Sequence, residues 1–275
     1  MIEDDRHTTG YWNRRAQAFL GTAQEIHAVC DASLLVGSGG SAPIEERGAR
    51  LVESHLPPGA RTLEVGCGYG RWFDLMGGER RLIGMDFSTM MGRRAAERRR
   101  SVPVLLGDVR QIPVAPGRLD AAYTMKVLQF LPDQERSAAV AGIFAAVRTG
   151  GVVVLFEKTA RPDGSPPGDW IEWSERAGGR LVAWYGNQFT PVDRALAGVA
   201  RALRPRLGPP PASSPGGGDP GSPLRRRHPG LFRAYSALQR LELRLSLPAE
   251  ALFERVLPKR WAEHAVFVFE KTTAA

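Results

Sequence analysis

The feature of this sequence that most clearly predicts chemistry is an alternation of glycines after a short apolar run, Leu63-Glu64-Val65-Gly66-Cys67-Gly68-Tyr69-Gly70. Glycines let a backbone turn approach a ligand closely because they carry no Cβ, and a helix that begins after the turn presents free N–H groups. The spacing here is GxGxG, whereas the dinucleotide fingerprint is GxGxxG, and no phosphate-loop motif ending in Gly-Lys-Ser/Thr occurs. The turn therefore predicts a ligand site and disfavours pyrophosphate binding.

Two carboxylates follow later apolar runs in the same way. Asp86 comes directly after residues 81–85, and Asp108 follows the next run along the chain. Because the carboxyl ends of parallel strands meet at one edge of a sheet, we expect both acids at the edge where ligands gather. An acid placed like Asp86 can accept both hydroxyls of a ribose, or it can cap the helix expected to begin near Ser88. Cys67, inside the glycine turn, is interpreted as a small packing residue and not a nucleophile.

Other polar side chains are expected at this edge, where they could hold or deprotonate a second substrate. His264 is the preferred candidate base because imidazole titrates near neutral pH, and Glu157 is the second candidate. Each has a plain alternative, since a histidine at the start of a strand is commonly a hydrogen-bonded structural residue. Tyr185, Asn187 and Gln188 are further polar residues at the end of a strand.

Short β-rich runs alternate with helical segments from Arg61 onward, and these elements must position the polar residues. Near-continuous apolar strands separated by helices are typical of a parallel sheet covered on both faces. The expected strands are residues 62–65, 81–85, 102–106, 121–125, 152–156, 181–185 and 265–269. The expected helices are residues 71–76, 89–100, 134–147 (ending at Gly150-Gly151) and 170–176 (closed by Gly178-Gly179).

The pattern divides the chain into four parts. Residues 1–55 are predicted to form an N-terminal helical cap, and residues 56–187 the Rossmann-like core. Residues 188–263 are predicted to form a helical insertion between strands six and seven, which covers the substrate, and residues 264–275 to return as the closing strand. Within the insertion, residues 205–223 are so rich in Pro, Gly and Ser that we expect a mobile loop.

Taken together, the motifs resemble those of the class I S-adenosylmethionine-dependent methyltransferases, over Arg61–Lys158 and the closing strand. The glycine turn with Glu64 resembles the first motif of the family, Asp86 its ribose-binding acid, and Asp108 the residue that meets the adenine amino group. The resemblance implies an α/β fold with a seven-stranded sheet whose last strand runs antiparallel between the fifth and sixth. It also implies S-adenosylmethionine as the cofactor.

The resemblance extends to the N-terminal segment around Tyr11 and Trp12, which is similar to the segment that closes over the cofactor in many small-molecule methyltransferases. These aromatics could instead simply anchor a helix on the domain. The cofactor-binding residues implied in this way are Glu64, Gly66, Cys67, Gly68, Gly70, Asp86, Phe87, Asp108, Val109, Met125, Tyr11 and Trp12. The catalytic candidates remain His264 and Glu157.

The composition fits a globular protein of 275 residues, 43% hydrophobic and 24% charged, which suits one α/β domain with additions. No apolar run approaches the roughly 18 residues that span a bilayer, and the acidic start lacks an export signal, so we expect a cytoplasmic protein. Two cysteines, Cys30 and Cys67, are too few for a cysteine-rich zinc site, and no metal is expected.

The net charge of +8 raises the question of a polyanionic partner. Lysines are few and the arginines are scattered, so nucleic acid is disfavoured, while Arg225-Arg226-Arg227 leaves peripheral membrane contact open. We expect methyl transfer to a small-molecule acceptor, with O-methylation of a secondary metabolite (natural product biosynthesis) or a sugar-containing intermediate favoured. The alternatives are a lipid-linked acceptor, RNA, or a methyltransferase fold that binds the cofactor without transferring a methyl group.

Overall fold

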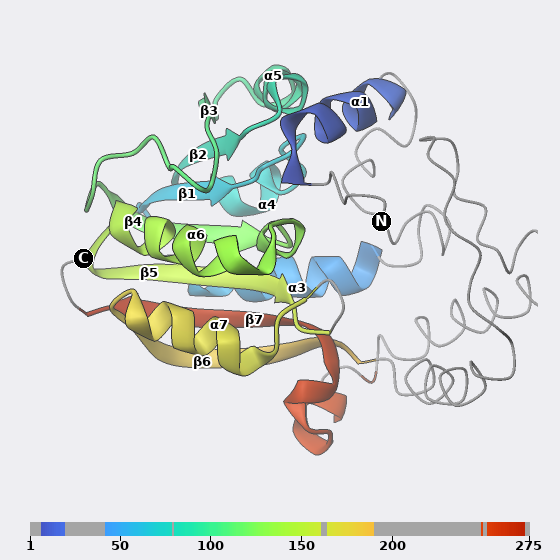
Figure 1. The fold of residues 1–275 in the computed structure, drawn as a ribbon, viewed down its shortest axis with the longest axis vertical. Helices are drawn as coiled ribbons and strands as arrows, with labels where there is room; N and C mark the ends of the chain where they lie inside the picture. Colours follow the sequence, from blue (N-terminus) through green and yellow to red (C-terminus); the bar gives the residue numbers. More distant parts are fainter. Residues whose placement is uncertain are drawn as a thin grey trace, which may run out of the picture.

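The computed structural model describes residues 7–19, 42–78, 80–160, 164–189, 249 and 252–272. These residues form a seven-stranded sheet with the strand order β3-β2-β1-β4-β5-β7-β6 (Figure 1). Strands β1 to β5 are parallel, and β7 lies antiparallel between β5 and β6. This topology confirms the fold class expected from the sequence.

The strands begin and end close to the predicted positions in the first half of the sheet. They are β1 (Arg61–Val65), β2 (Arg81–Asp86), β3 (Val104–Leu106), β4 (Leu119–Met125), β5 (Val147–Lys158), β6 (Gly179–Phe189) and β7 (Ala262–Lys271). The last three are longer than predicted. Buried strand residues form two apolar clusters, one on each face of the sheet.

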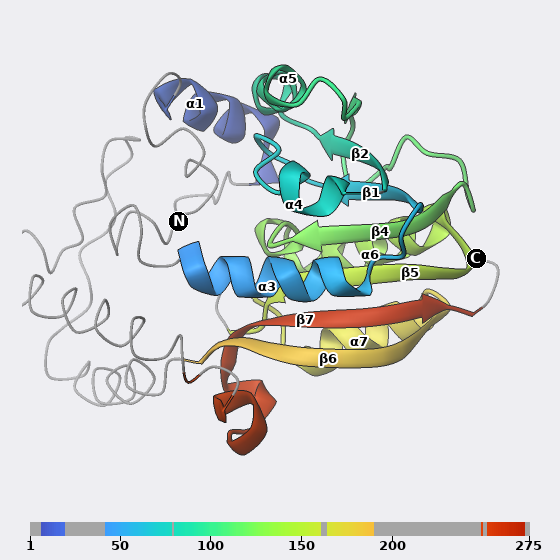
Figure 2. The ribbon, with the colours of Figure 1, turned by 180° about the vertical axis from the view of Figure 1, so that it is seen from behind.

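Helices cover both faces of the sheet and separate the parallel strands. They are α1 (Thr9–Phe19), α3 (Ala42–His55), α4 (Phe73–Gly77), α5 (Thr89–Arg98), α6 (Asp133–Ala146) and α7 (Pro167–Arg176), with the 3-10 turns η3 (Leu128–Phe130) and η4 (Lys259–Trp261). Figure 1 shows α6 and α7 in front of the sheet, and the view from behind in Figure 2 shows α3 and α4 on the other face. Residues 252–256 are also helical.

Of the two glycine pairs predicted to end helices, Gly178-Gly179 closes α7 as expected and Gly150-Gly151 lies elsewhere than predicted. The helix before β5 ends at Ala146 and the strand starts at once, so Gly150-Gly151 belong to the strand region and do not cap the helix. Buried Lys271 closes this helix instead, because its Nζ donates to the carbonyls of Phe144 and Val147 at 2.8 and 2.7 Å. After α7, Gly178 has φ of +85° and its N–H donates to the Glu175 carbonyl at 3.0 Å, and Gly179 begins β6. The prediction missed a cap supplied by the far end of the chain.

The predicted division into cap, core and insertion remains a prediction. Helices α1 and α3 fall within the expected N-terminal cap, but most of the insertion, including the loop 205–223 and Arg225-Arg226-Arg227, lies outside the described residues. Among the helices that are described, none is both long and apolar enough to cross a membrane.

Candidate functional site

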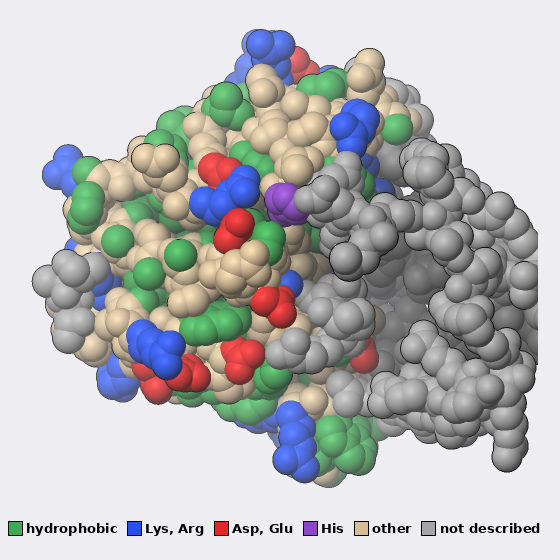
Figure 3. All heavy atoms as spheres, viewed as in Figure 1, with side chains coloured by type: hydrophobic (Ala, Val, Ile, Leu, Met, Phe, Trp, Pro, Cys, Tyr) green, Lys and Arg blue, Asp and Glu red, His purple; other side chains and the backbone are tan. Residues whose placement is uncertain are grey.

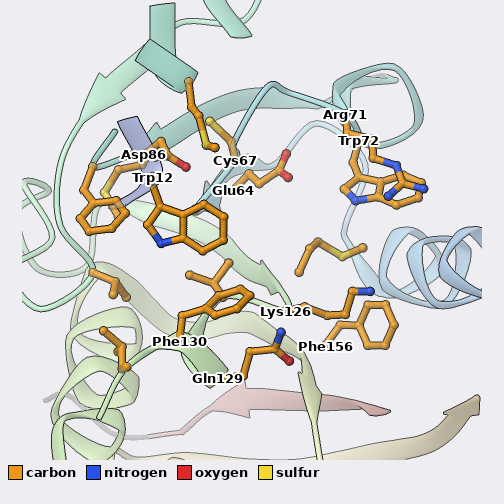
Figure 4. A pocket seen from close by; sticks show the side chains of 18 of the residues that line it. Trp12, Glu64, Cys67, Arg71, Trp72, Asp86, Lys126, Gln129, Phe130 and Phe156 are labelled. Carbon is orange, nitrogen blue, oxygen red and sulfur yellow. The ribbon is translucent and has the colours of Figure 1, made fainter. Parts of the chain in front are cut away.

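A cavity of about 230 Å³ lies at the carboxyl ends of the parallel strands, where the sequence placed the ligand site. Figure 4 shows Trp12 and Phe130 next to each other on one side of it, and Arg71, Trp72 and Lys126 on the other. We call the two sides the Trp12 end and the Lys126 end. The Trp12 end is lined by Trp12, Asp86, Phe87, Asp108, Val109 and Phe130, and the Lys126 end by Glu45, Arg71, Trp72, Lys126, Phe156, Lys158, Gln188 and His264.

The glycine turn after β1 forms the wall between the two ends. Gly66 has φ of +71°, and a Cβ built on it would lie 2.5 Å from the Val127 side chain, so the position requires glycine. The N–H groups of Gly66 and Cys67 both donate to the carbonyl of Met85, at 2.7 and 2.9 Å. Gly66 and Cys67 line the cavity. Gly68 and Gly70 belong to the same turn but are not among the lining residues.

Asp86 ends β2 and faces the cavity while its carboxylate organises the turn. Its two oxygens accept the N–H groups of Gly68 and Ser88, both at 2.8 Å. Burial raises the pKa of Asp86 to about 6, although these backbone donors oppose the shift. The group is therefore ionised at neutral pH, and a carboxylate with about four acceptor positions keeps capacity for hydroxyl donors from a ligand.

Glu64 lies on the neighbouring strand and is almost completely buried, at 1% exposure. It accepts the Tyr123 hydroxyl at 2.7 Å, yet burial, together with nearby Asp86, raises the pKa of Glu64 to about 8. The carboxyl is thus mostly protonated at neutral pH and can donate a hydrogen bond. Burial also raises the pKa of the Cys67 thiol well above its usual range, which agrees with the packing role expected for it.

The aromatic side chains of the Trp12 end are held by α1. Trp12 is 5% exposed and meets the Phe130 ring edge-on, with centroids 4.9 Å apart. Helix α1 docks on the start of α5 because the Asn13 Oδ1 accepts the Ser88 hydroxyl at 2.7 Å. Tyr11 packs against Trp12 but is not among the residues that line the cavity.

Asp108 lines the same end but is already paired. Its Oδ2 accepts the Arg110 Nη2 at 2.6 Å and its Oδ1 accepts the Arg110 Nε at 2.9 Å. Partial burial acts to raise the pKa of Asp108, but Arg110 outweighs it and the pKa is lowered. Val109 beside it is 9% exposed and lines the cavity, as does Met125 on β4.

The charged residues of the Lys126 end were not predicted from the sequence. Glu45 on α3 is 3% exposed and bonds to both Lys126 and Arg71, the latter at 2.5 Å. Burial alone would raise the pKa of Glu45, but Lys126 and Arg71 outweigh it and lower the pKa to about 2. Arg71 and Lys126 follow the ends of β1 and β4, and that position was the signal that could have found them.

The two candidate bases are separated by the structure. His264 lines the cavity at the Lys126 end, where burial, followed by Lys126 and Lys158, lowers the pKa of the imidazole well below its usual range. Glu157 is fully buried and is not among the lining residues. Its carboxylate accepts the N–H groups of Val127, Leu128 and Gln129, at 3.1, 3.2 and 3.3 Å. The structure therefore gives Glu157 a positioning role and no access to an acceptor.

The turn that Glu157 holds is clamped from its other side by buried Arg136. The Arg136 Nε donates to the carbonyls of Leu128 and Leu131, both at 3.1 Å, and the Nη2 donates to Gln129. A carboxylate thus takes the N–H groups and a guanidinium takes the carbonyls of one short turn. This turn carries lining residues of both ends of the cavity, so the clamp fixes their relative position.

The remaining polar residues expected at this edge are distributed differently. Gln188 lines the cavity. Tyr185 and Asn187 do not: the Tyr185 hydroxyl lies 3.1 Å from the His55 Nε2, and the Asn187 Oδ1 accepts the Arg47 Nη1 at 2.9 Å. Both residues hold α3 against β6.

The cavity fits the S-adenosylmethionine that the sequence resemblance implies. The glycine turn provides a cradle that a Cβ at Gly66 would fill, and Asp86 and Trp12 offer a ribose acceptor and an aromatic wall. The buried Gln129 Oε1 in the lining has no hydrogen-bond partner, which leaves one acceptor for a donor on a ligand. In the described part of the chain, no three His, Cys, Asp or Glu residues are grouped to hold a metal ion.

Comparison with known sequences agrees with this geometry. A family profile described as a methyltransferase domain matches residues 62–151. A carboxy-S-adenosyl-L-methionine synthase from Chromohalobacter salexigens is 33% identical over 125 residues, which are 41% of this chain and 45% of that protein. A malonyl-acyl-carrier-protein O-methyltransferase from Serratia marcescens is 32% identical over 159 residues, 57% of this chain and 58% of the relative. The matches span about half the length of these curated relatives.

Solved structures show the same fold at low sequence identity. The magnesium protoporphyrin IX methyltransferase of Synechocystis PCC 6803 is 18% identical with a TM-score of 0.51, covering 69% of this chain and 89% of that one. The cyclase SpnF is 16% identical with a TM-score of 0.52, covering 83% and 81%. Residues 62–151 thus match a methyltransferase domain, and the sheet order and the glycine turn support the resemblance to the class I S-adenosylmethionine-dependent methyltransferases.

Proposed function

We propose that this protein transfers a methyl group from S-adenosylmethionine to an oxygen of a small organic acceptor. The observation that carries the proposal is the cavity at the carboxyl ends of the strands, in which Asp86, the glycine turn and Trp12 share one end. The acceptor enters from the Lys126 end, beside the turn that carries Gln129. The name of the Serratia relative, an O-methyltransferase, supports oxygen as the atom methylated.

In the proposed reaction the protein mainly binds, orients and excludes water. When bound, the cofactor supplies a methyl group whose bond to sulfur breaks, with the electron pair kept by sulfur, as the bond to the acceptor oxygen forms. Asp86 fixes the ribose, and Trp12 and Phe130 enclose the nucleoside. Glu157 and Arg136 hold the turn against which the reacting groups are aligned.

A hydroxyl acceptor must lose its proton, and we assign His264 as the group that receives it. The imidazole is neutral because burial and the two nearby lysines lower its pKa, so its ring nitrogens include an acceptor at neutral pH. The low pKa makes His264 a weak base, so this role fits an acceptor hydroxyl whose own pKa is lowered by Lys126 and Lys158. An acceptor that is already ionised would not need this step.

Three alternatives to a small-molecule methyltransferase make different predictions. An RNA substrate would require a continuous basic face, but Lys/Arg and Asp/Glu side chains are interspersed on the described part of the face in Figure 3. An activity other than methyl transfer on this fold is illustrated by SpnF, whose name describes a cyclase. A lipid-linked acceptor would enter by the same end of the cavity and is one class to include in the assay.

The proposal is tested in two stages. Calorimetric titration should show micromolar binding of S-adenosylmethionine and S-adenosylhomocysteine and no binding of NADH. Transfer of a labelled methyl group to a panel of small acceptors, lipid extract and RNA then identifies the acceptor class. Binding of both nucleosides with no transfer to any acceptor class would favour the non-transferring alternative, and no binding by the folded protein would contradict the proposal.

A further inference from the structure

Three cations and one carboxylate gather at the Lys126 end of the cavity. Arg71, Lys126 and Lys158 all line this end, and Glu45 is the acid among its described lining residues. Glu45 is bonded to both Arg71 and Lys126, so one negative charge is shared between two positive charges. Lys158 adds a third positive charge. The charges of the described lining residues at this end therefore sum to a positive value.

Lys126 and Lys158 both act through their charge on the position of His264. Lys158 lies directly across from His264 in the pairing of β5 with β7, so their side chains lie on the same face of the sheet. Lys126 and Lys158 both lower the pKa of the His264 imidazole through their charge, in addition to the effect of burial. A positive charge is disfavoured at this position and a negative charge is stabilised there.

The backbone is strained at this end of the cavity. Among the described residues, the non-glycine residues with positive φ are Lys126, at +62°, and Gln188, at +64°. Both line the Lys126 end. Left-handed backbone in residues with a side chain costs free energy and is concentrated at functional sites, where the surrounding structure enforces it. Here it places a cation and an amide in the lining of the same end of the cavity.

The walls around these charges are apolar and aromatic. Phe156 is 1% exposed, and Trp72 lies beneath the Arg71 guanidinium, whose carbon is 4.4 Å from the ring centroid. The Trp12 end, by contrast, carries the acids Asp86 and Asp108. A ligand that fits the Lys126 end therefore combines a negative group with an apolar body.

We propose that the Lys126 end binds a carboxylate of the methyl acceptor, held by Lys158 and Lys126 beside His264 and Gln188, so that the substrate is an organic acid with an apolar body. The inference rests on the proposed function, because it takes this end as the acceptor side of the cavity. A carboxylate is the group chosen because Arg71 and Lys126 already bind one, that of Glu45, at the same place.

The test compares matched neutral and anionic probes on the full chain. Octanoate and octanamide are titrated calorimetrically with and without saturating S-adenosylhomocysteine. We expect octanoate to bind about tenfold more tightly than octanamide, with the preference weakening at high salt. Lys158→Met should remove the preference, Lys158→Arg should keep most of it, and Lys259→Met, a lysine outside the cavity, should leave it unchanged.

Equal binding of octanoate and octanamide, or an undiminished preference in Lys158→Met, would overturn the proposal. A third result would assign the cations to the cofactor. In that result Lys158→Met weakens the binding of S-adenosylhomocysteine but leaves unchanged the binding of 5′-methylthioadenosine, which lacks the amino acid. In that case the cations hold the carboxylate of the cofactor and the proposal is wrong. Because the titration is repeated without nucleoside, a failure of cofactor binding remains distinguishable from a failure of carboxylate selectivity.

Discussion

The two ends of the cavity are built in different ways. The Trp12 end is supported by groups close together along the chain: the glycine turn, Asp86 two residues before the Ser88 that caps α5, and the turn after β3. The Lys126 end takes Glu45 from α3, Lys126 from the position directly after β4, Lys158 from β5 and His264 from β7. A site made of local backbone turns leaves a sequence motif, whereas a site made of distant side chains does not.

The ends also differ in charge and in the consequence of burial. At the Trp12 side, burial raises the pKa of Asp86 and Glu64, to about 6 and about 8, because their hydrogen-bond donors carry no charge, whereas Arg110 lowers the pKa of Asp108. At the Lys126 end, burial of Glu45 is outweighed by two cations, and its pKa falls to about 2. Burial alone therefore does not decide the ionisation of a cavity acid, since the partners brought by the fold can reverse it.

The largest expected effect comes from the turn shared by both ends. Glu157→Ala removes three buried hydrogen bonds to backbone N–H groups and should lower the free energy of unfolding by about 4 kcal/mol. Glu157→Gln keeps an acceptor oxygen and should cost roughly 1–2 kcal/mol. Denaturant unfolding measures both. Full stability with loss of methyl transfer in Glu157→Gln would instead mark a catalytic base.

Asp86→Asn should affect the Trp12 end alone. Loss of charge-assisted hydrogen bonds to a ribose should weaken S-adenosylhomocysteine binding roughly 100-fold, about 2.7 kcal/mol. Binding of 5′-methylthioadenosine should weaken equally because it has the same ribose, while octanoate binding should not change. Asp74→Asn, on an exposed side chain of α4, is the control. An unaffected nucleoside affinity in Asp86→Asn would remove the assigned role of this acid.

Gly48→Ala should disturb the Lys126 end because it changes how α3 packs against Phe156. A Cβ at Gly48 would lie 2.4 Å from the Phe156 ring, so the helix that carries Glu45 must shift. We expect a destabilisation of about 2 kcal/mol from overpacking and a weaker octanoate preference. Adding Phe156→Leu should recover part of the stability. No loss in the single variant would mean that α3 does not depend on this close contact.

The last expected effect is a pH-dependent one at Glu64, which is absent at low pH. Because its folded pKa is raised to about 8 from an ordinary value of 4.5, the stability it contributes is complete below about pH 4.5 and is lost as the pH rises toward 8. Glu64→Gln does not ionise, so its stability does not fall in this way as the pH rises. Its melting temperature should match that of the wild type near pH 5 and exceed it by roughly 5–10 °C near pH 8. A difference independent of pH would contradict the raised pKa.

The accuracy of the sequence-based prediction follows the same contrast between local and distant contacts. The strands β1, β2 and β4 and the helix α5 were predicted within two residues, since apolar runs and the Ser88 cap define them locally. The end of α6 was predicted to within one residue, but its cap was wrong because buried Lys271, more than a hundred residues later, supplies it. Glu157 was expected at the cavity because it ends a strand, but its side chain turns to the backbone of the next loop.

The sequence by itself determined the resemblance to the methyltransferases, the sheet, the glycine turn and the acid Asp86, because each depends on residue types at fixed short spacing. Only the tertiary structure decided which polar residues share the cavity. It brings together Glu45, Lys126, Lys158 and His264, and it directs the Glu157 carboxylate to backbone N–H groups instead. It also decided their ionisation. Charge interactions act through space, so the distance along the chain carries no information about them.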